Sequence, residues 1–441
     1  MVLGVKLAVY ILAVLPAVLS ELEPHPARTR RRHHVRTTQS LDVDIDLGPA
    51  NAYDSESPGQ FRFPYGQTKV RGVNLGGWLV LESWITPSLF DATGDDRIID
   101  EYTFGQYQDK DVATAALQKH WDTWITEPDL AAIAAAGLNH VRVPIGFWAF
   151  DVSGGEPYIQ GQFPYLCKAI EWAAKYDIKV IIDLHGAPGS QNGFDNSGRA
   201  GNTTWHLYQS NVDRTNAIIK LLAAEFSQPK YKNVVATIAP LNEPASFRGG
   251  NIVNVTRQYW LDSYQSIRHP FGGSREGNLF ELIHDAFEPI SFWNGFMTKP
   301  NYTGVALDTS ICNIGKNDIK PFNAAYLPVI TGEFSNALTD CAKNINGRFR
   351  GSRYDGTFPG STKTGNCTGK SGSGADFTDD YKVELGKYFE AQTTTYEING
   401  SGWIFWTWKA ENAAEWSYQV GLAGGWIPQD PTERKYPNPC V

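Results

Sequence analysis

Two glutamates follow short apolar runs and could together cleave a glycosidic bond. Glu243 follows an apolar run that begins at Val234, and Glu333 follows the run from Val329 to Gly332. Both runs predict buried strands, and carboxyls at the carboxyl ends of parallel strands can face each other across one site. Glycosidic bond cleavage requires such a pair. A Glu before a Pro at a strand end is more often a solvated loop residue, so this interpretation depends on the surrounding residues.

The two positions suit different roles in cleavage with retained configuration. Glu243 precedes Pro244 and follows Asn242, whose amide can bind a sugar 2-hydroxyl, and this suits the general acid and base. Glu333 is then the nucleophile, kept ionised by donors such as Arg142. A retaining enzyme would hold the two carboxyls about 5 to 5.5 Å apart.

The elements that must position these residues alternate along the chain. Short apolar runs followed by longer amphipathic segments predict a single (β/α)8 TIM barrel with elaborated loops, spanning residues 61–441. The predicted strands are Val70 to Leu75, His140 to Ile145, Lys179 to His185, Val234 to Glu243, Leu279 to Asp285, Gly304 to Asp308, Val329 to Glu333 and Gly402 to Lys409. The predicted helices are Leu117 to Ala136, Tyr165 to Tyr176, Val212 to Phe226, Tyr259 to Ile267 and Tyr381 to Tyr396.

Polar and aromatic residues gather where the predicted strands end. They are Asn74, Glu82, Arg142, Asp183, His185, Asn242, Glu243, His284, Asp285, Glu333, Trp406 and Trp408. Structural roles compete with functional ones: Arg142 and His185 fit both, Asp183 suits a brace in the barrel floor, and Trp406 suits core packing. Phe194 differs because the loop of residues 189–198 is too polar for the core, so we expect this ring in the substrate path.

The N-terminal segment predicts export. Residues 1–20 combine Lys6, the apolar stretch from Leu7 to Leu19 and a small residue at Ser20, as in a secretory signal peptide, with a buried helix as the alternative. Residues 21–60 are too poor in apolar side chains to fold and predict a disordered pro-segment or tail. Their basic run fits a processing site or linker better than a polyanion-binding site. No later stretch could span a bilayer, so we expect a secreted extracellular or cell-wall protein without membrane attachment after signal removal.

The composition limits the classes of substrate and cofactor that we expect. The 39 basic and 47 acidic residues give no footprint for nucleic acid, so the substrate should be neutral or cationic. Carboxylate chemistry needs neither a metal nor an organic cofactor. The five cysteines predict two disulfides and one free thiol, with Cys167 the odd one because it lies in a helical pattern. Five glycosylation sequons agree with export: Asn202, Asn254, Asn301, Asn366 and Asn399.

Six motifs resemble the fungal exo-beta-1,3-glucanases of glycoside hydrolase family 5. The motifs are Arg71 to Trp78, Ile85 to Phe90, Val143 to Phe150, Asp183 to Asp195, Leu241 to Pro244 and Trp403 to Asn412. The likeness runs from about Phe61 to Cys440, and the long loop after the third strand is its most specific part. It implies a hydrolase that releases glucose from the non-reducing ends of beta-1,3-glucan or its oligosaccharides. We expect the protein to be a monomer.

The resemblance also implies roles for single residues. Glu243 would be the acid and base and Glu333 the nucleophile, and the terminal glucose would be lined by Glu82, Arg142, His185, Asp195, Asn242 and Trp408. The resemblance also implies two disulfides, Cys312 with Cys440 and Cys341 with Cys367.

One segment departs from the family pattern. In these enzymes the sixth strand continues into residues carrying a His and a Tyr of the active site, whereas here Thr309 passes directly into Ser310 and Cys312. A true deletion or an incorrectly spliced gene model would produce this gap. The alternative function is therefore a catalytically impaired, glucan-binding wall protein.

Overall fold

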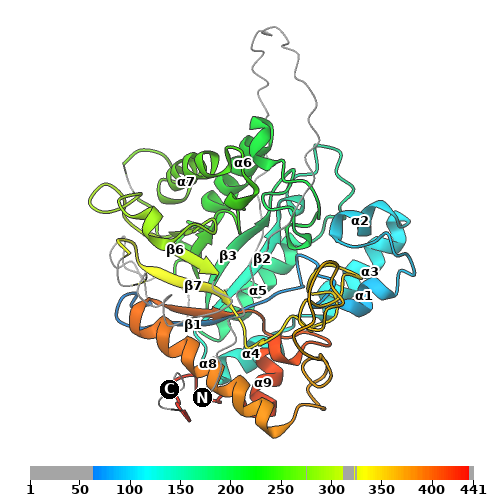
Figure 1. Ribbon diagram of the computed structural model, residues 1–441. Coiled ribbons are helices and arrows are strands. Elements are labelled where there is room, and N and C mark those ends of the chain that lie inside the picture. Colours follow the sequence, from blue (N-terminus) through cyan, green and yellow to red (C-terminus); the bar gives the residue numbers. More distant parts are fainter. Residues whose placement is uncertain (1–62, 275, 311–321, 323–324, 437–441) are drawn as a thin grey trace. The chain divides into compact units, whose positions relative to one another are not determined.

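The computed structural model describes residues 63–274, 276–310, 322 and 325–436. Within them, eight parallel strands close into one barrel in chain order, with β1 hydrogen-bonded to β8 (Figure 1). The strands are β1 Val70–Asn74, β2 His140–Gly146, β3 Lys179–Gly186, β4 Val235–Ala239, β5 Phe280–His284, β6 Val305–Ser310, β7 Val329–Phe334 and β8 Gly402–Phe405. The predicted TIM barrel is confirmed. The predicted signal peptide, the whole predicted pro-segment of residues 21–60 and the pair Cys312 and Cys440 lie outside the described residues.

Helices follow most of the strands, although their bounds differ from prediction. They are α1 Pro87–Asp91, α2 Glu101–Gln106, α3 Lys110–Thr123, α4 Glu127–Ala135, α5 Phe163–Lys175, α6 Gln209–Phe226, α7 Ile252–Arg268, α8 Asp379–Asn399 and α9 Tyr418–Gly424. Between β5 and β6 the described residues form only the 3-10 turn Ile290–Trp293. Over the described ranges, no helix combines the length and apolarity needed to cross a bilayer.

The single helix predicted from Leu117 to Ala136 is wrong, because the chain forms two helices there. α3 ends at Thr123, and α4 begins after Thr126, whose backbone N–H and hydroxyl both donate to the Asp129 carboxylate. Pro128 lies in the first turn of α4, where its missing N–H costs no helical hydrogen bond. The capping box and this proline start a new helix.

The barrel interior is layered. One apolar layer comprises Val70, Ile181, Ala239, Leu282, Ala306, Ile330 and Ile404, with Phe63 and Tyr65 packed against it. Side chains two residues apart on a strand share a face, so Asp183 and Asp308 point into the next layer, towards the strand ends. The apolar layer therefore supports a polar one above it.

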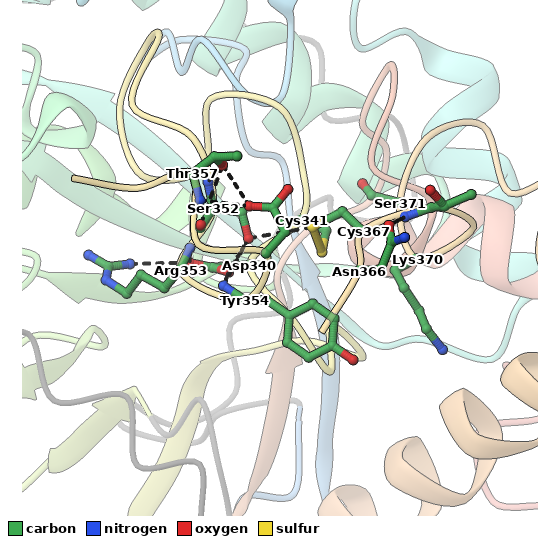
Figure 2. The surroundings of a disulfide bond; sticks show 12 residues. Asp340, Cys341, Ser352, Arg353, Tyr354, Thr357, Asn366, Cys367, Lys370 and Ser371 are labelled. Atoms are coloured by element: carbon green, nitrogen blue, oxygen red, sulfur yellow. Dashed lines mark hydrogen bonds and ion pairs between the residues drawn. A yellow bond between two sulfur atoms is a disulfide. The ribbon is translucent and has the colours of Figure 1, made fainter. Parts of the chain in front are cut away.

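A disulfide closes the long segment between β7 and α8 (Figure 2). Cys341 and Cys367 are bonded with their Cα atoms 5.3 Å apart, as predicted. Beside them, Asp340 accepts hydrogen bonds from the Ser352 hydroxyl and from the backbone N–H groups of Arg353 and Tyr354. Cys167 is a buried free thiol, also as predicted. The disulfide and the Asp340 contacts hold together a segment that has no regular structure of its own.

Candidate active site

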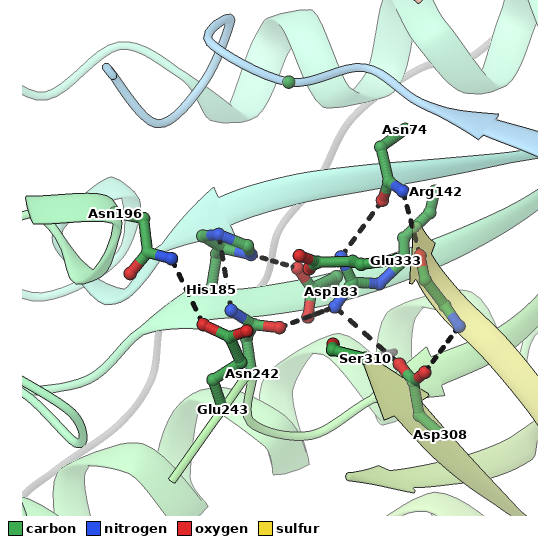
Figure 3. Close-up of polar contacts among 12 residues, drawn as sticks. Asn74, Arg142, Asp183, His185, Asn196, Asn242, Glu243, Asp308, Ser310 and Glu333 are labelled. Atoms are coloured by element: carbon green, nitrogen blue, oxygen red, sulfur yellow. Dashed lines mark hydrogen bonds and ion pairs between the residues drawn. The ribbon is translucent and has the colours of Figure 1, made fainter. Parts of the chain in front are cut away.

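Arg142 is the centre of the polar layer. Its guanidinium comes from β2, is fully buried and donates to Glu333 Oε1 at 2.8 Å, Asn242 Oδ1 at 2.8 Å and Asn74 Oδ1 at 3.0 Å (Figure 3). It also lies 3.1 Å from the Asp183 carboxylate and 3.9 Å from that of Asp308. A buried cation needs such partners to offset its desolvation. One side chain thereby connects the ends of strands β1, β3, β6 and β7 with Asn242 beyond β4.

Asn242 is held in one orientation from both sides of its amide. Its oxygen accepts from Arg142, so its Nδ2 points towards His185 Nε2, 3.4 Å away. His185 Nδ1 lies 2.6 Å from Asp183 Oδ2, which makes Nδ1 the protonated nitrogen and Nε2 the acceptor. Asp183 therefore bridges Arg142 and His185 rather than only bracing the floor. The sequence-predicted residues Arg142, His185 and Asn242 form one connected network.

The backbone just before Glu333 packs closely against the Asp308 carboxylate. The Gly332 N–H donates to Asp308 Oδ1 at 2.7 Å, and a Cβ built on Gly332 would lie 2.2 Å from that oxygen. Only glycine fits beside the Asp308 carboxylate, and the next residue, Glu333, then reaches Arg142. Asp308 was not among the residues singled out from the sequence, because nothing in the run from Val305 to Asp308 distinguishes an inward carboxylate from a strand end.

Glu243 has a strained backbone, and its side-chain hydrogen-bond donor is a neutral group. Its backbone φ is 48°, a left-handed conformation that is uncommon for residues with a side chain and that concentrates at functional sites. Its Oε2 accepts from the amide of Asn196 at 3.2 Å. Sequence reasoning missed Asn196, since it lies in the irregular loop after β3 and no periodicity marks its direction.

The two glutamates differ in their capacity for ionisation. Burial raises the pKa of both above the usual range for glutamate, and the charge of Glu243 raises that of Glu333 further. Arg142 opposes this by direct contact with Glu333, whereas the side-chain donor to Glu243 is the neutral amide of Asn196. The direct contact with Arg142 favours the ionised form of Glu333, and the neutral amide of Asn196 supports an ionised Glu243 less strongly. Such a pair can supply a nucleophile and a general acid.

Two further carboxyls, Glu82 and Asp195, lie close enough to interact. Glu82 accepts from the indole N–H of Trp84 at 2.8 Å, and burial and the Asp195 charge raise its pKa well above the usual range. Burial also raises the pKa of Asp195 to about 6. Asp195 Oδ2 is buried and has no hydrogen-bond partner among the described residues. Buried acceptors of this kind fit the hydroxyl groups of a bound sugar.

Comparison with known proteins agrees with this chemistry. A family model described as "Cellulase (glycosyl hydrolase family 5)" matches residues 106–269. The chain is 43% identical over 393 residues to the probable glucan 1,3-beta-glucosidase A of Aspergillus niger, covering 86% of this chain and 92% of that protein. It is also 43% identical over 403 residues to a glucan 1,3-beta-glucosidase of Blumeria graminis, with the same two coverages. The chain belongs to glycosyl hydrolase family 5.

Solved structures agree on the fold of this family 5 chain. The rutinosidase of Aspergillus niger superposes with a TM-score of 0.63 at 19% identity, covering 82% of this chain and 98% of the rutinosidase. At this identity the likeness concerns the barrel and not the substrate. The family assignment therefore rests on the sequence relatives.

Trp408, expected to line the site of this family 5 barrel, has its recorded contacts with two helices. Trp408 is 1% exposed, its indole N–H donates to Asp129 of α4 at 2.9 Å, and its ring stacks on Tyr418 of α9. Trp406 packs in an apolar cluster with Trp84 and Ile85, as predicted, and it also stacks on His185 with ring centroids 5.4 Å apart. β8 ends at Phe405, so strand alternation no longer decides which of the two indoles faces the barrel.

Phe194 is half-buried and belongs to a row of aromatic rings. Its ring lies 6.3 Å from that of Phe247, which lies 5.2 Å from that of Phe287. Phe247 and Phe287 are 47% and 38% exposed, and the guanidinium of Arg248 lies over both Phe194 and Phe247. The row joins the loops after β3, β4 and β5, and Phe287 lies 5.5 Å from His284. Exposed rings in such a row offer apolar faces to a ligand.

Proposed function

We propose that this protein is a secreted, retaining exo-hydrolase that releases glucose from the non-reducing ends of beta-1,3-glucan. The observation that carries the mechanism is the contrast between Glu333, which contacts the buried guanidinium of Arg142, and Glu243, whose side-chain donor is a neutral amide. The linkage and the substrate class come from the names of the relatives that are 43% identical to this chain.

In the first step of the proposed reaction, a Glu333 oxygen attacks the anomeric carbon. The bond from this carbon to the glycosidic oxygen breaks, and the proton of Glu243 passes to the leaving glucan chain. In the second step the Glu243 carboxylate takes a proton from water, and the water oxygen attacks the anomeric carbon. Glucose leaves, Glu333 is released from its ester, and Glu243 again carries a proton. The net reaction adds one water across one glycosidic bond.

The terminal glucose is proposed to bind among the buried polar groups. Glu82 and Asp195 offer carboxyl oxygens to sugar hydroxyls, and Asp195 Oδ2 has no partner among the described residues. Asn242, whose amide is held by Arg142 and His185, is proposed to bind the sugar 2-hydroxyl. Trp406 and the aromatic row of Phe194, Phe247 and Phe287 supply apolar faces for the terminal ring and for the leaving chain.

The alternative of a glucan-binding wall protein without activity has no support in the comparisons, whose sequence relatives carry enzyme names. The His and Tyr that the family carries after the sixth strand are absent from the sequence following Ser310, and residues 311–321 lie outside the described residues. Both glutamates and their partners are in place without them. We therefore retain the hydrolase as the proposal.

The test is glucose release from laminarihexaose by the purified protein, with Glu333→Gln as the control. The proposal expects glucose and laminaripentaose as the first products, with the released glucose initially in the β configuration by proton NMR. Larger first products would reject exo-cleavage, and the α configuration would reject retention. Equal activity, or none, in both proteins would reject the hydrolase itself.

A further inference from the structure

Two buried carboxyls at the start of the short helix α2 have no role in the proposed reaction. Asp100 caps this helix and Glu101 is its first residue, and each is only 2% exposed. The charge of Asp100 raises the pKa of Asp195, and the charge of Asp195 raises that of Glu82, so the start of α2 lies close to the proposed sugar-binding carboxyls. A buried carboxyl is costly to the fold unless it is hydrogen-bonded. The hydrogen bonds of Asp100 and Glu101 therefore indicate what these residues do.

Asp100 divides its two oxygens between the helix and the loop after β3. Its Oδ1 accepts from the backbone N–H of Thr103 at 2.8 Å and from the Thr103 hydroxyl at 2.6 Å, which caps α2. Its Oδ2 accepts from the backbone N–H of Ala200 at 2.7 Å. Ala200 lies in the same loop as Asp195, so this second hydrogen bond joins the loop to the start of α2.

The first turn of α2 contacts this loop a second time. The Tyr102 N–H donates to the Gly198 carbonyl at 2.8 Å, and the Arg199 guanidinium lies 4.0 Å from the centroid of the Tyr102 ring. Gly198 ends the 3-10 turn Asp195–Ser197, with a left-handed φ of 85°. The turn that carries Asp195 therefore ends against α2.

Glu101 makes the corresponding contact with the loop after β1. Its Oε2 accepts from the backbone N–H of Leu81, the residue before Glu82, at 2.8 Å. Its Oε1 accepts from the indole N–H of Trp148 at 2.7 Å. The Trp148 ring lies so close to Gly198 that a Cβ built on this glycine would be 2.4 Å from it. Glu101 thus supports both loops, one directly and the other through the indole.

We propose that Asp100 and Glu101 are positioning residues for the terminal glucose, which hold the loops of Glu82 and Asp195 at a fixed separation. This inference rests on the proposed function, in which those two carboxyls bind sugar hydroxyls. Hydrogen bonds weaken steeply when their geometry is distorted, so two loops that bind one sugar ring must keep their spacing. One short helix that binds the backbones of both loops meets this requirement.

The test uses an aryl β-glucoside, whose only sugar is the terminal glucose. Asp100→Asn keeps an oxygen for the helix cap but turns an NH2 group towards the Ala200 N–H, so the loop of Asp195 should shift. KM should rise by about tenfold, the loss expected for one hydrogen bond to a charged group. The inhibition constant of glucose should rise by a similar factor. The change in kcat should be smaller, because the ground state and the transition state lose the same contact.

A double-mutant cycle separates positioning from a general contribution to the fold. If Asp100 acts through Asp195, then Asp100→Asn should change the KM of Asp195→Ala by less than about twofold, whereas independent effects would multiply. Glu101→Gln should raise KM in the same way and should be coupled to Glu82→Ala. Circular dichroism checks the fold of each variant. Glu101→Gln carries the test alone if Asp100→Asn does not fold.

Asp109→Ala is the matched control, because Asp109 also caps a helix. Its Oδ1 accepts from the N–H groups of Asp111 and Val112, and both of these residues belong to the helix that it caps, α3. Its KM should equal that of the wild type. The inference is overturned if a folded Asp100→Asn or Glu101→Gln keeps the wild-type KM. It is also overturned if the effects in the cycles multiply, or if Asp109→Ala raises KM equally.

Failure of the proposed function gives a different result. A wild-type protein that cleaves neither laminari-oligosaccharides nor the aryl β-glucoside would reject the hydrolase and, with it, this inference. An active wild type whose paired substitutions multiply in both cycles would reject the positioning role alone. Coupled losses in an active enzyme, with the control unchanged, support both proposals.

Discussion

Glu333 lies near the end of β7, and Glu243 lies in the loop after β4; both side chains are largely buried, yet their surroundings differ. Around Glu333 the protein has placed a guanidinium that is itself held by Asp183, Asn74 and Asn242. Around Glu243 it has placed an amide and a left-handed backbone turn. Burial alone would treat the two carboxyls alike, so the difference proposed between their roles comes from their different partners.

The largest effect should follow removal of the carboxyl beside the guanidinium. Glu333→Gln keeps the shape but cannot form the glycosyl ester, so kcat on laminari-oligosaccharides should fall by at least about 10⁴-fold. Initial-rate glucose release measures this loss. Circular dichroism should show an intact fold. A loss below tenfold would mean that Glu333 is not the nucleophile.

The loss of activity caused by the matching substitution of Glu243 should depend on the leaving group of the substrate. Glu243→Gln should lower kcat/KM on laminari-oligosaccharides by about 10² to 10⁴-fold, the usual contribution of a general acid. A dinitrophenyl β-glucoside needs no protonation to leave, so its first step should remain close to wild type in a burst measurement. Equal losses on both substrates would remove the contrast between the two glutamates.

Substitution of Arg142 tests whether its guanidinium causes the difference between Glu333 and Glu243. Arg142→Met leaves Glu333 and Asp183 without their cation, and breaking a buried ion pair in this way costs about 3 to 5 kcal/mol in unfolding free energy. Urea unfolding should show this loss. Arg142→Lys retains a charge but not the forked donors, so it should recover part of the stability and less of the activity. Wild-type stability in Arg142→Met would contradict the structure.

The smallest effect should come from the amide beside Glu243. Asn196 stabilises the ionised carboxylate and so lowers the pKa of Glu243, and Asn196→Ala should raise it. Activity requires protonated Glu243, so the alkaline limb of kcat/KM should move to higher pH by less than about one unit. The acid limb should stay where it is. Movement of the alkaline limb to lower pH would reverse the assigned role of Asn196.

Much of this contrast could be predicted from the sequence, because strand ends are marked by local patterns. The apolar runs before Glu243 and Glu333 placed both carboxyls at strand ends, and Arg142 follows from the same alternation. Beyond the strand ends that alternation stops. Trp406 and Trp408 could not be separated after β8 ended at Phe405, and Asn196 lies in a loop whose path depends on tertiary contacts. Pro128 and Thr126 did carry a signal for two helices, which the longer apolar pattern obscured.

Gly332 has a consequence for how this chain tolerates mutation. It touches no proposed sugar group, yet any side chain there would collide with Asp308 only 2.2 Å from its Cβ. In a saturation scan this position should behave like a catalytic one, with nearly every replacement eliminated, while exposed surface neighbours vary freely. The residue before the proposed nucleophile is therefore restricted to glycine by the space beside its backbone, and not by any contact with the sugar.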